Sequence, residues 1–370
     1  MNAESLAALV DEVVAASPPG STPPAGVAVG VATRDGGPLR MATIGWRDAD
    51  ASLPLTDTTR HDLASVTKVV TTACLMTLVS ARAVDLDDEV QHFLPAAHSG
   101  ITVRDLLLHR GGLWEWYPLY AAVDDPTDVD AVHAFVDALP GRYPRGQARH
   151  YSDLGFIQLG RIVAAAAGSS LPDAVAELIA FPLGLRSLRY GSPDDADDVA
   201  TSALDDRVEM TMLDTGEPYA VPFRSSDFAG WRTAPVTGSV NDGNAFHALG
   251  GVSGHAGLFA TVDDLATLGA ALAAAGEHDD LWAPPVVAEF YRPGPDTGQS
   301  LGFRRYSVPD VDTDVLGHTG FVGTGIGFVP DAGIAAVLAS NRLVTSGTPV
   351  SSVDLWHAVL NQTLHGDGDG

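Results

Sequence analysis

The sequence predicts an α+β fold in which both ends of the chain build one antiparallel sheet and the middle forms a mostly α-helical insertion. Two strand-like stretches, residues 25–34 and 38–46, lie near the start, and three more, around 300–307, 322–329 and 333–340, lie near the end. Helical periodicity dominates between them. Strands at both ends with helices between them favour a two-layer arrangement over a doubly wound sheet.

The first element is an amphipathic helix, which ends at the proline-rich break of residues 17–24. The next two strands are joined by a turn at Asp35-Gly36-Gly37. We assign residues 1–60 and 205–370 to an α/β sheet domain and residues 61–204 to a mostly helical domain. A ligand site is expected in the cleft between them.

The helical region begins near Ser65, and a loop-rich stretch follows from about residue 185 to residue 244. A later helix carries acidic residues in its first turn, where the helix dipole favours negative charge. An amphipathic helix closes the chain at about residue 364. The helix with the acidic first turn is expected at residues 262–276. The remaining helices are expected at residues 103–109, 129–139, 154–168 and 171–180.

The composition and net charge limit the classes of partner that the protein is expected to bind. The chain has 370 residues, 45% of them apolar, and a net charge of −26 with a single lysine. Such a surface repels nucleic acid and anionic membranes, so neither is expected as a partner. No apolar run approaches the roughly 20 residues of a membrane span. The acidic, lysine-poor composition fits either a surface adapted to high salt or the codon bias of a GC-rich genome, and both interpretations stay open.

The beginning of the sequence lacks a basic leader followed by an apolar stretch, so we expect a cytoplasmic protein unless a leader was trimmed. Cys74 is the only cysteine, which excludes an internal disulfide and favours a small buried side chain. We find no metal-ligand cluster and no nucleotide-binding motif, so no metal and no cofactor are expected. The sequence does not indicate whether the protein is a monomer or an oligomer.

The sharpest chemical signal is Ser65 followed three residues later by Lys68, at the start of an apolar helix. Residues i and i+3 share a helix face, so the amine would lie beside the hydroxyl. A serine needs an adjacent base, and Lys68 can be that base only if it is largely neutral. We therefore expect burial or nearby positive charge to lower the pKa of Lys68. Taken alone, the pair could be an N-cap and a surface lysine. Lys68 is the only lysine of the chain, which favours the catalytic interpretation.

Two further motifs follow, Tyr151-Ser152-Asp153 and His318-Thr319-Gly320. With S-x-x-K they resemble, in order, the motif set of the serine β-lactamases and penicillin-binding proteins. The branch most similar contains class C β-lactamases, D-alanyl-D-alanine carboxypeptidases and related esterases. LLLHRGGL (106–113) and residues 250–269 also resemble this group, and the likeness covers about residues 20–362. It implies a β-lactamase/transpeptidase-like fold.

The resemblance also implies catalytic roles. Ser65 would attack the carbonyl, Lys68 would accept its proton, and Tyr151 would relay a proton to the leaving group. His318 would supply a donor or a positive charge beside Tyr151. The N–H groups of Ser65 and Phe321 would form the oxyanion hole.

Two departures from the family pattern bear on the substrate. Asp153 stands where asparagine is usual, and an ionised carboxylate only accepts hydrogen bonds. His318 stands where lysine is usual, so its charge depends on pH. Both weaken the case for an anionic substrate, and we expect a small, uncharged, partly apolar one. The residues expected to contact it are Asp153, Thr319, Gly320, Trp114 and Trp116, although the two tryptophans could equally cap the helical domain.

These observations predict a serine hydrolase that acts through an acyl-enzyme on a small ester or amide. A D-alanyl-D-alanine carboxypeptidase or a β-lactamase is the alternative within the enzyme class. An idle, ligand-binding member of the fold is the alternative outside it, since fold alone does not settle function.

Overall fold

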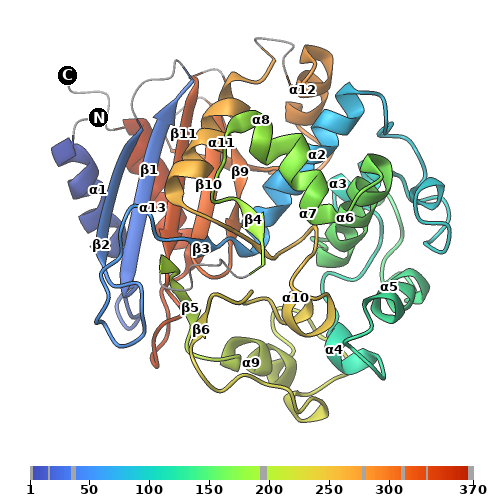
Figure 1. Ribbon diagram of the computed structural model, residues 1–370, viewed down its shortest axis with the longest axis horizontal. Coiled ribbons are helices and arrows are strands. Elements are labelled where there is room, and N and C mark those ends of the chain that lie inside the picture. The colour runs from blue at the N-terminus through green and yellow to red at the C-terminus, as the bar shows by residue number, and fades with distance from the viewer. Residues whose placement is uncertain are drawn as a thin grey trace.

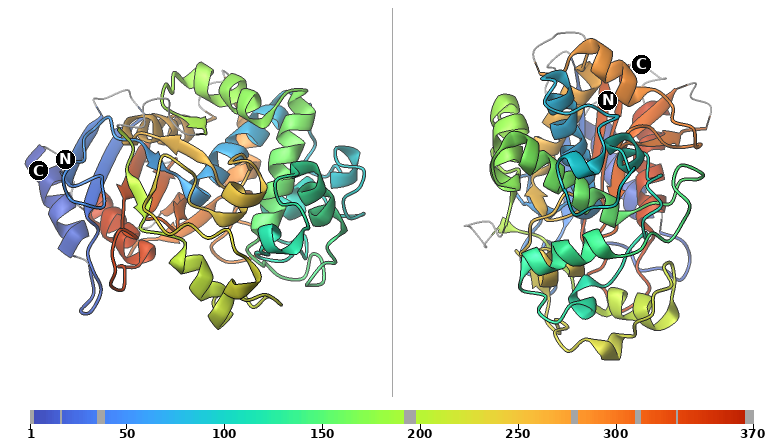
Figure 2. Two further views of the ribbon diagram at one scale, coloured as in Figure 1. Left: turned by 60° about the horizontal axis from the view of Figure 1, so that its bottom comes forward. Right: turned by 90° about the vertical axis from the view of Figure 1, so that its right-hand side faces the viewer.

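The computed structural model describes residues 3–15, 17–34, 39–191, 198–276, 281–309, 313–330 and 332–365. It has the predicted α+β architecture, with an antiparallel sheet on one side and a group of helices on the other (Figure 1). The first and last described helices, Ala3–Ala15 and Ser352–His365, lie at the sheet end, far from the helices of residues 100–170 (Figure 2). The turn predicted at residues 35–37 falls outside the described residues.

The main sheet has six strands, each antiparallel to its neighbours. Its two halves join where β1 pairs with β11, from Val27 opposite Ser340 to Thr33 opposite Ile334. This pairing brings the two ends of the chain together, as the sequence predicted. The spatial order is β2 (Arg40–Gly45), β1 (Gly26–Thr33), β11 (Ile334–Ser340), β10 (Thr324–Val329), β9 (Asp314–Gly320) and β8 (Arg304–Ser307).

Helices cover both faces of this sheet. One face carries α1 (Ala3–Ala15) and α13 (Ser352–His365), and the other carries α11 (Val262–Ala274) (Figure 1). The helices approach closely because glycines face them. A Cβ atom at Gly325 or Gly327 would come within 2.7 Å of the Trp356 ring. The alternating glycines of this strand therefore serve helix packing.

The central helix of the molecule is α2 (Thr67–Ser80), which is almost completely buried. It packs against α6 (Asp153–Ala167), and the largest hydrophobic core joins both helices to the inner face of the sheet. Cys74 lies in this core, as expected. The other helices are α3 (Val103–Leu107), α4 (Leu119–Ala122), α5 (Val129–Ala138), α7 (Leu171–Val175), α8 (Phe181–Leu183), α9 (Arg207–Thr215), α10 (Gly243–Ala248) and α12 (Pro284–Tyr291).

Among the described residues, no single helix is long and apolar enough to cross a membrane. The bent pair of α6 with the segment Leu171–Leu183 passes that test together, by length and composition only.

Short strands lie between the sheet and the helices. β3 (His61–Asp62) pairs with β7 (Leu258–Ala260), which also pairs with β4 (Arg189–Tyr190). β5 (Thr201–Ala203) pairs with β6 (Val236–Thr237). Strand β3 ends three residues before Ser65, so this small sheet fixes the approach to the nucleophile.

The structure differs from the predicted elements in several places: α9 lies in the stretch predicted to be loop-rich, and α12 lies where no helix was predicted. Two further differences concern a strand and a helix. Strand β9, which carries His318, was not predicted separately, because Gly317, Thr319 and Gly320 interrupt its apolar pattern. The helix predicted at residues 171–180 is ordinary α-helix only to Val175 and continues as a wider π-type turn.

The predicted division at residue 204 stays a prediction. An aromatic cluster nevertheless joins α5 and the start of α6 to the segment that follows this boundary. Leu213, Tyr219, Phe228 and Trp231 of that segment pack with the helices.

Candidate active site

Ser65 lies on a short 3₁₀ turn, η1 (Ala64–Val66), directly before α2. Ala64 has a φ of 43°, a left-handed conformation that is costly for a residue with a Cβ atom. The buried Asp62 holds this turn, because its Oδ1 accepts the Ala64 N–H at 2.7 Å and its Oδ2 accepts the Asn241 N–H at 2.6 Å. Burial raises the pKa of Asp62 to about 6. The nucleophile is thus presented by a strained turn that a carboxylate braces.

Lys68 lies one turn along α2 and is completely buried. Its Nζ donates to Ser65 Oγ at 2.8 Å and to the His255 carbonyl at 3.2 Å. Asp153 Oδ1 lies 2.8 Å from the same nitrogen as an ion-pair partner. The proximity predicted from the i, i+3 spacing is therefore present, together with a carboxylate that the spacing did not reveal.

The protonation state expected for Lys68 is wrong. Burial lowers the pKa of Lys68, but the charge of Asp153 and the hydrogen bonds with Asp153 and Tyr151 raise it, and the net shift is upward from the ordinary value. Sequence reasoning counted the burial and omitted the carboxylate next to it. The upward direction of the shift favours the ammonium form of Lys68 in the free protein.

Tyr151 completes the contacts of the nucleophile, since its hydroxyl donates to Ser65 Oγ at 3.0 Å. Burial raises the pKa of Tyr151 although Lys68 opposes the shift, so the side chain is a neutral phenol. Ser152, the middle residue of the motif, caps α6: its Oγ accepts the Gly155 N–H at 3.0 Å. The three residues thus divide into one that touches Ser65, one that caps the helix and one that faces Lys68.

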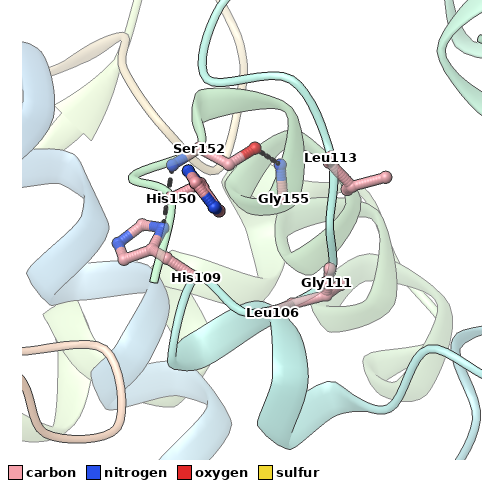
Figure 3. A pocket seen from close by; sticks show the side chains of 7 residues that line it. All are labelled: Leu106, His109, Gly111, Leu113, His150, Ser152 and Gly155. Atoms are coloured by element: carbon pink, nitrogen blue, oxygen red, sulfur yellow. Dashed lines mark hydrogen bonds between the residues drawn. The ribbon is translucent and has the colours of Figure 1, made fainter. Parts of the chain in front are cut away.

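His109 packs against the Tyr151-Ser152-Asp153 motif, and sequence reasoning assigned it no role. Its Nδ1 accepts the Ser152 N–H at 3.0 Å (Figure 3). Its ring centroid lies 4.8 Å from that of Tyr151. Its backbone φ is 57°. Burial holds the pKa of His109 well below its ordinary value. The only available signal was its place in the LLLHRGGL segment.

His318 lies on β9, buried, with its ring centroid 5.7 Å from that of Tyr151. Its Nδ1 lies 2.7 Å from the Thr319 carbonyl, which assigns the proton to Nδ1, and its buried Nε2 has no hydrogen-bond partner among the described residues. Burial and the nearby Arg304 and Lys68 hold the pKa of His318 well below its ordinary value. Of the two roles expected for His318, the positive charge is wrong, and its Nε2 is a neutral acceptor instead of a donor.

The end of β9 lies against the turn that carries Ser65. A Cβ atom at Gly320 would come within 2.7 Å of the Leu63 carbonyl oxygen, and Thr324 Oγ1 donates to the same oxygen at 3.1 Å. Arg342 Nε donates to the Phe321 carbonyl at 2.7 Å, which orients that peptide. The two segments predicted to supply the oxyanion hole are thus adjacent, while the oxyanion hole itself stays a prediction.

The two tryptophans make packing contacts of the kind that the packing alternative expects, and their contact with a substrate stays a prediction. Trp116 is buried in the aromatic cluster of the helical side. The Trp114 ring packs against Tyr117 and lies 4.5 Å from the Arg142 guanidinium, while its Nε1 donates to the Pro140 carbonyl. Neither contact points to a substrate.

Two arginines flank Tyr151, and sequence reasoning missed both. The guanidinium of Arg304 lies 5.2 Å from the Tyr151 ring centroid, and that of Arg149 lies 5.9 Å from it. Arg149 Nε donates to Gln299 at 2.8 Å, and burial together with Arg304 lowers the pKa of Arg149. Arg304 Nε is buried without a hydrogen-bond partner among the described residues. Within the described part of the chain, neither side chain pairs with a carboxylate.

The geometry described above agrees with three comparisons. The model of the family described as Beta-lactamase matches residues 9–358. The N-acetylmuramyl-L-alanine amidase of Bacillus subtilis (strain 168) is 28% identical over 310 residues, which cover 77% of this chain and 68% of that protein. A protein of Escherichia coli (strain K12) named "Putative D-alanyl-D-alanine carboxypeptidase" is also 28% identical, over 77% of this chain and 69% of its own length.

Among solved structures, this chain is similar to EstCE1, a hydrolase with promiscuous acyltransferase activity. The TM-score is 0.71 with 20% identity, and the alignment covers 97% of this chain and 98% of that one. At this identity the likeness shows the fold alone.

Proposed function

This chain belongs to the beta-lactamase family of serine hydrolases, and we propose that it cleaves an ester or amide through an acyl-enzyme on Ser65. The observation that carries the proposal is the placement of Ser65 Oγ, which lies 2.8 Å from Lys68 Nζ and 3.0 Å from the Tyr151 hydroxyl. A nucleophile between a base and a proton donor is the arrangement that acyl transfer needs.

In the proposed reaction, Ser65 Oγ attacks the carbonyl carbon while its proton passes to Lys68, which must first have become a neutral amine. The N–H groups of Ser65 and Phe321 hold the oxyanion. The Tyr151 hydroxyl donates a proton to the leaving group, and Lys68 reprotonates Tyr151. Water then attacks the acyl-enzyme, with its proton returned along the same groups.

The arginine pair bears on the substrate. Two cations that pair with no carboxylate of the described residues, in a chain of net charge −26, favour a substrate that carries an acidic group near the scissile bond. This argues against the uncharged substrate expected from the sequence. The same observation favours a carboxypeptidase-like activity, in which the leaving group bears a carboxylate, as the second candidate.

The nucleophile is tested by mass spectrometry after exposure to a fluorophosphonate, a penicillin and a short-chain aryl ester in parallel. We expect an adduct on the peptide that contains Ser65. Ser65→Ala should form none and should lose at least about 1,000-fold in turnover, as removal of a nucleophile does, with an unchanged melting temperature. An adduct on another residue, or more than a few per cent of residual turnover, contradicts the assignment.

The acidic group is tested in the same assay with phenyl acetate and 3-acetoxybenzoate, which differ by one carboxylate. We expect the wild type to prefer 3-acetoxybenzoate and Arg304→Gln to lose about 10-fold or more of that preference, since a hydrogen bond to a charged group contributes roughly 1.5–3 kcal/mol. Arg292→Gln, at an exposed arginine on the end of α12, is the matched control. Equal wild-type rates on both esters refute the acidic group.

A further inference from the structure

The last residue of the second motif faces the base. Asp153 begins α6, and its backbone N–H donates to the Glu115 carbonyl at 2.8 Å. Its carboxylate is only 12% exposed, and Oδ1 lies 2.8 Å from Lys68 Nζ. Among the described residues, this oxygen has no hydrogen-bond partner besides the ion-pair contact with Lys68. An asparagine here would have a similar shape without the charge.

The other ionisable groups around Lys68 do not replace this carboxylate. On the loop after α3 and on β9, burial keeps the pKa values of His109 and His318 well below their ordinary value, so both rings are neutral. Tyr151 is a neutral phenol, and Arg304 of β8 adds positive charge. His255 presents its backbone carbonyl to Lys68, while its ring binds Asp242 at 3.0 Å. Among the described residues, Asp153 is therefore the carboxylate in ion-pair contact with Lys68.

We propose that Asp153 is a positioning residue that holds Lys68 as an ammonium ion in the free enzyme and thereby sets the lowest pH at which Ser65 becomes a nucleophile. The inference rests on the proposed function, because it concerns the base of that reaction. An ammonium ion has no lone pair for the Ser65 proton. One N–H bond of Lys68 must break first, its proton leaving to solvent and its electron pair staying on nitrogen. That pair then takes the Ser65 proton, and Asp153 remains a carboxylate throughout.

A purely structural role is the competing explanation, since a carboxylate in the first turn also stabilises a helix through its dipole. Loss of that role would lower stability and activity at every pH alike. The proposed role instead moves the pH dependence. Removing the carboxylate leaves the burial of Lys68 in place, and burial alone favours the neutral amine.

The protonation of Lys68 can be measured directly, because it is the only lysine in the chain. Lysine labelled with ¹³C gives a single side-chain Cε signal that needs no assignment. In the wild type we expect this signal to stay at its ammonium position up to at least pH 9. In Asp153→Asn the signal should titrate at least one pH unit below the wild-type midpoint, or below the highest pH at which the wild-type lysine is still an ammonium ion. In Asp153→Glu the midpoint should return toward the wild-type value.

The matched control is Asp137→Asn. Asp137 is also a buried carboxylate and pairs with Arg161 of the same helix α6, at 2.6 Å, but it does not contact Lys68. Its substitution removes the same charge and should leave the lysine titration in place. A wild-type lysine that is neutral at pH 7, or an unchanged titration in Asp153→Asn, overturns the proposal.

Kinetics provide the second readout. The acid limb of kcat/KM should move to lower pH by at least one unit in Asp153→Asn, so that activity at the foot of that limb rises about 10-fold relative to its own plateau. An equal loss at every pH overturns the proposal in favour of the structural role. Failure of the proposed function would appear separately, as absence of the Ser65 adduct, and the lysine titration does not depend on it.

Discussion

Two clusters of ionisable side chains with little solvent exposure show opposite effects of burial on a carboxylate. In the active site, Asp153 faces Lys68 at 2.8 Å and the two form a charged pair. In the second cluster, Glu209 of α9 accepts hydrogen bonds from the Tyr120 hydroxyl at 2.7 Å and the Gly243 N–H at 3.1 Å, and within the described part of the chain it forms no ion pair. Burial and the neighbouring Asp242 raise the pKa of Glu209 to about 8. The nearest opposite charge, rather than burial, decides whether a carboxylate stays ionised.

Within the second cluster, Asp242 and Glu209 differ in the same way. Burial raises the pKa of Asp242, but His255 and the N–H of Ala245 outweigh it and lower the value to about 2. The Nδ1 of the same histidine lies 2.7 Å from Ser253 Oγ, and its carbonyl accepts from Lys68. His255 therefore connects the two clusters, and Asp242 and Glu209 lie behind the active site rather than in it.

The largest expected effect comes from changing the cation of the first cluster. Lys68→Arg keeps a positive charge beside Asp153 but cannot give up a proton at working pH. We expect acyl-enzyme formation to slow by at least about 100-fold, the lower end of the range for a general base, which single-turnover mass spectrometry of the Ser65 peptide measures. Circular dichroism and the melting temperature report whether the variant folds.

Acylation of Lys68→Arg at nearly the wild-type rate would remove lysine as the base and transfer that role to Tyr151. Where Lys68→Arg does not fold, Lys68→Met is the second variant. It removes charge and base together and should lose at least as much activity.

The comparison also explains which parts of the site could be predicted from sequence. Ser65 and Lys68 are three residues apart on one helix, so their contact follows from local geometry. The ion pair of Lys68 with Asp153 and the approach of Arg304 to Tyr151 join segments that are far apart in the chain. Their consequence for charge could not be derived from spacing, and the lowered pKa expected for Lys68 was wrong for that reason.

At the level of the fold, the long apolar elements were predictable, and strand β9 was not, because glycine and polar residues interrupt its pattern. Family resemblance supplied the likeness of His318-Thr319-Gly320 to the third motif. It could not supply the neutral state of His318, which depends on its burial near Arg304 and Lys68.

A smaller effect is expected from Glu209→Gln. Because the folded-state pKa of Glu209 is raised from 4.5 to about 8, its contribution to stability is fully present below pH 4.5 and is lost as pH rises through about 8. Glutamine has no proton to lose. The melting temperature of the variant relative to wild type should therefore increase by several degrees from pH 5 to pH 9.

Glu177→Gln, at an exposed glutamate, is the control and should show no such change. A constant difference between Glu209→Gln and the wild type over this pH range would mean that Glu209 is ionised in the folded protein, and that burial without a cation does not neutralise a carboxylate here.

The smallest expected effect separates buried from exposed charge. The described acidic side chains include many on the surface, and a net charge of −26 makes their mutual repulsion unfavourable to folding. Salt screens exposed charges, with a Debye length of about 10 Å at 0.1 M and about 3 Å at 1 M, and screens buried pairs much less. We expect the melting temperature to rise by a few degrees between 0.1 M and 2 M KCl.

Over the same salt range, the ¹³C titration of Lys68 should not move: its midpoint, or the highest pH at which the ammonium signal persists, should stay the same. The reason is that the Lys68–Asp153 pair is buried. Chloride is preferred to sulfate, since sulfate also strengthens apolar burial and would raise the melting temperature by a second route. A flat melting temperature would favour codon bias over salt adaptation as the origin of the acidic composition. A lysine titration that moves with salt would place the active-site pair among the screened charges and would remove the distinction between buried and surface pairs.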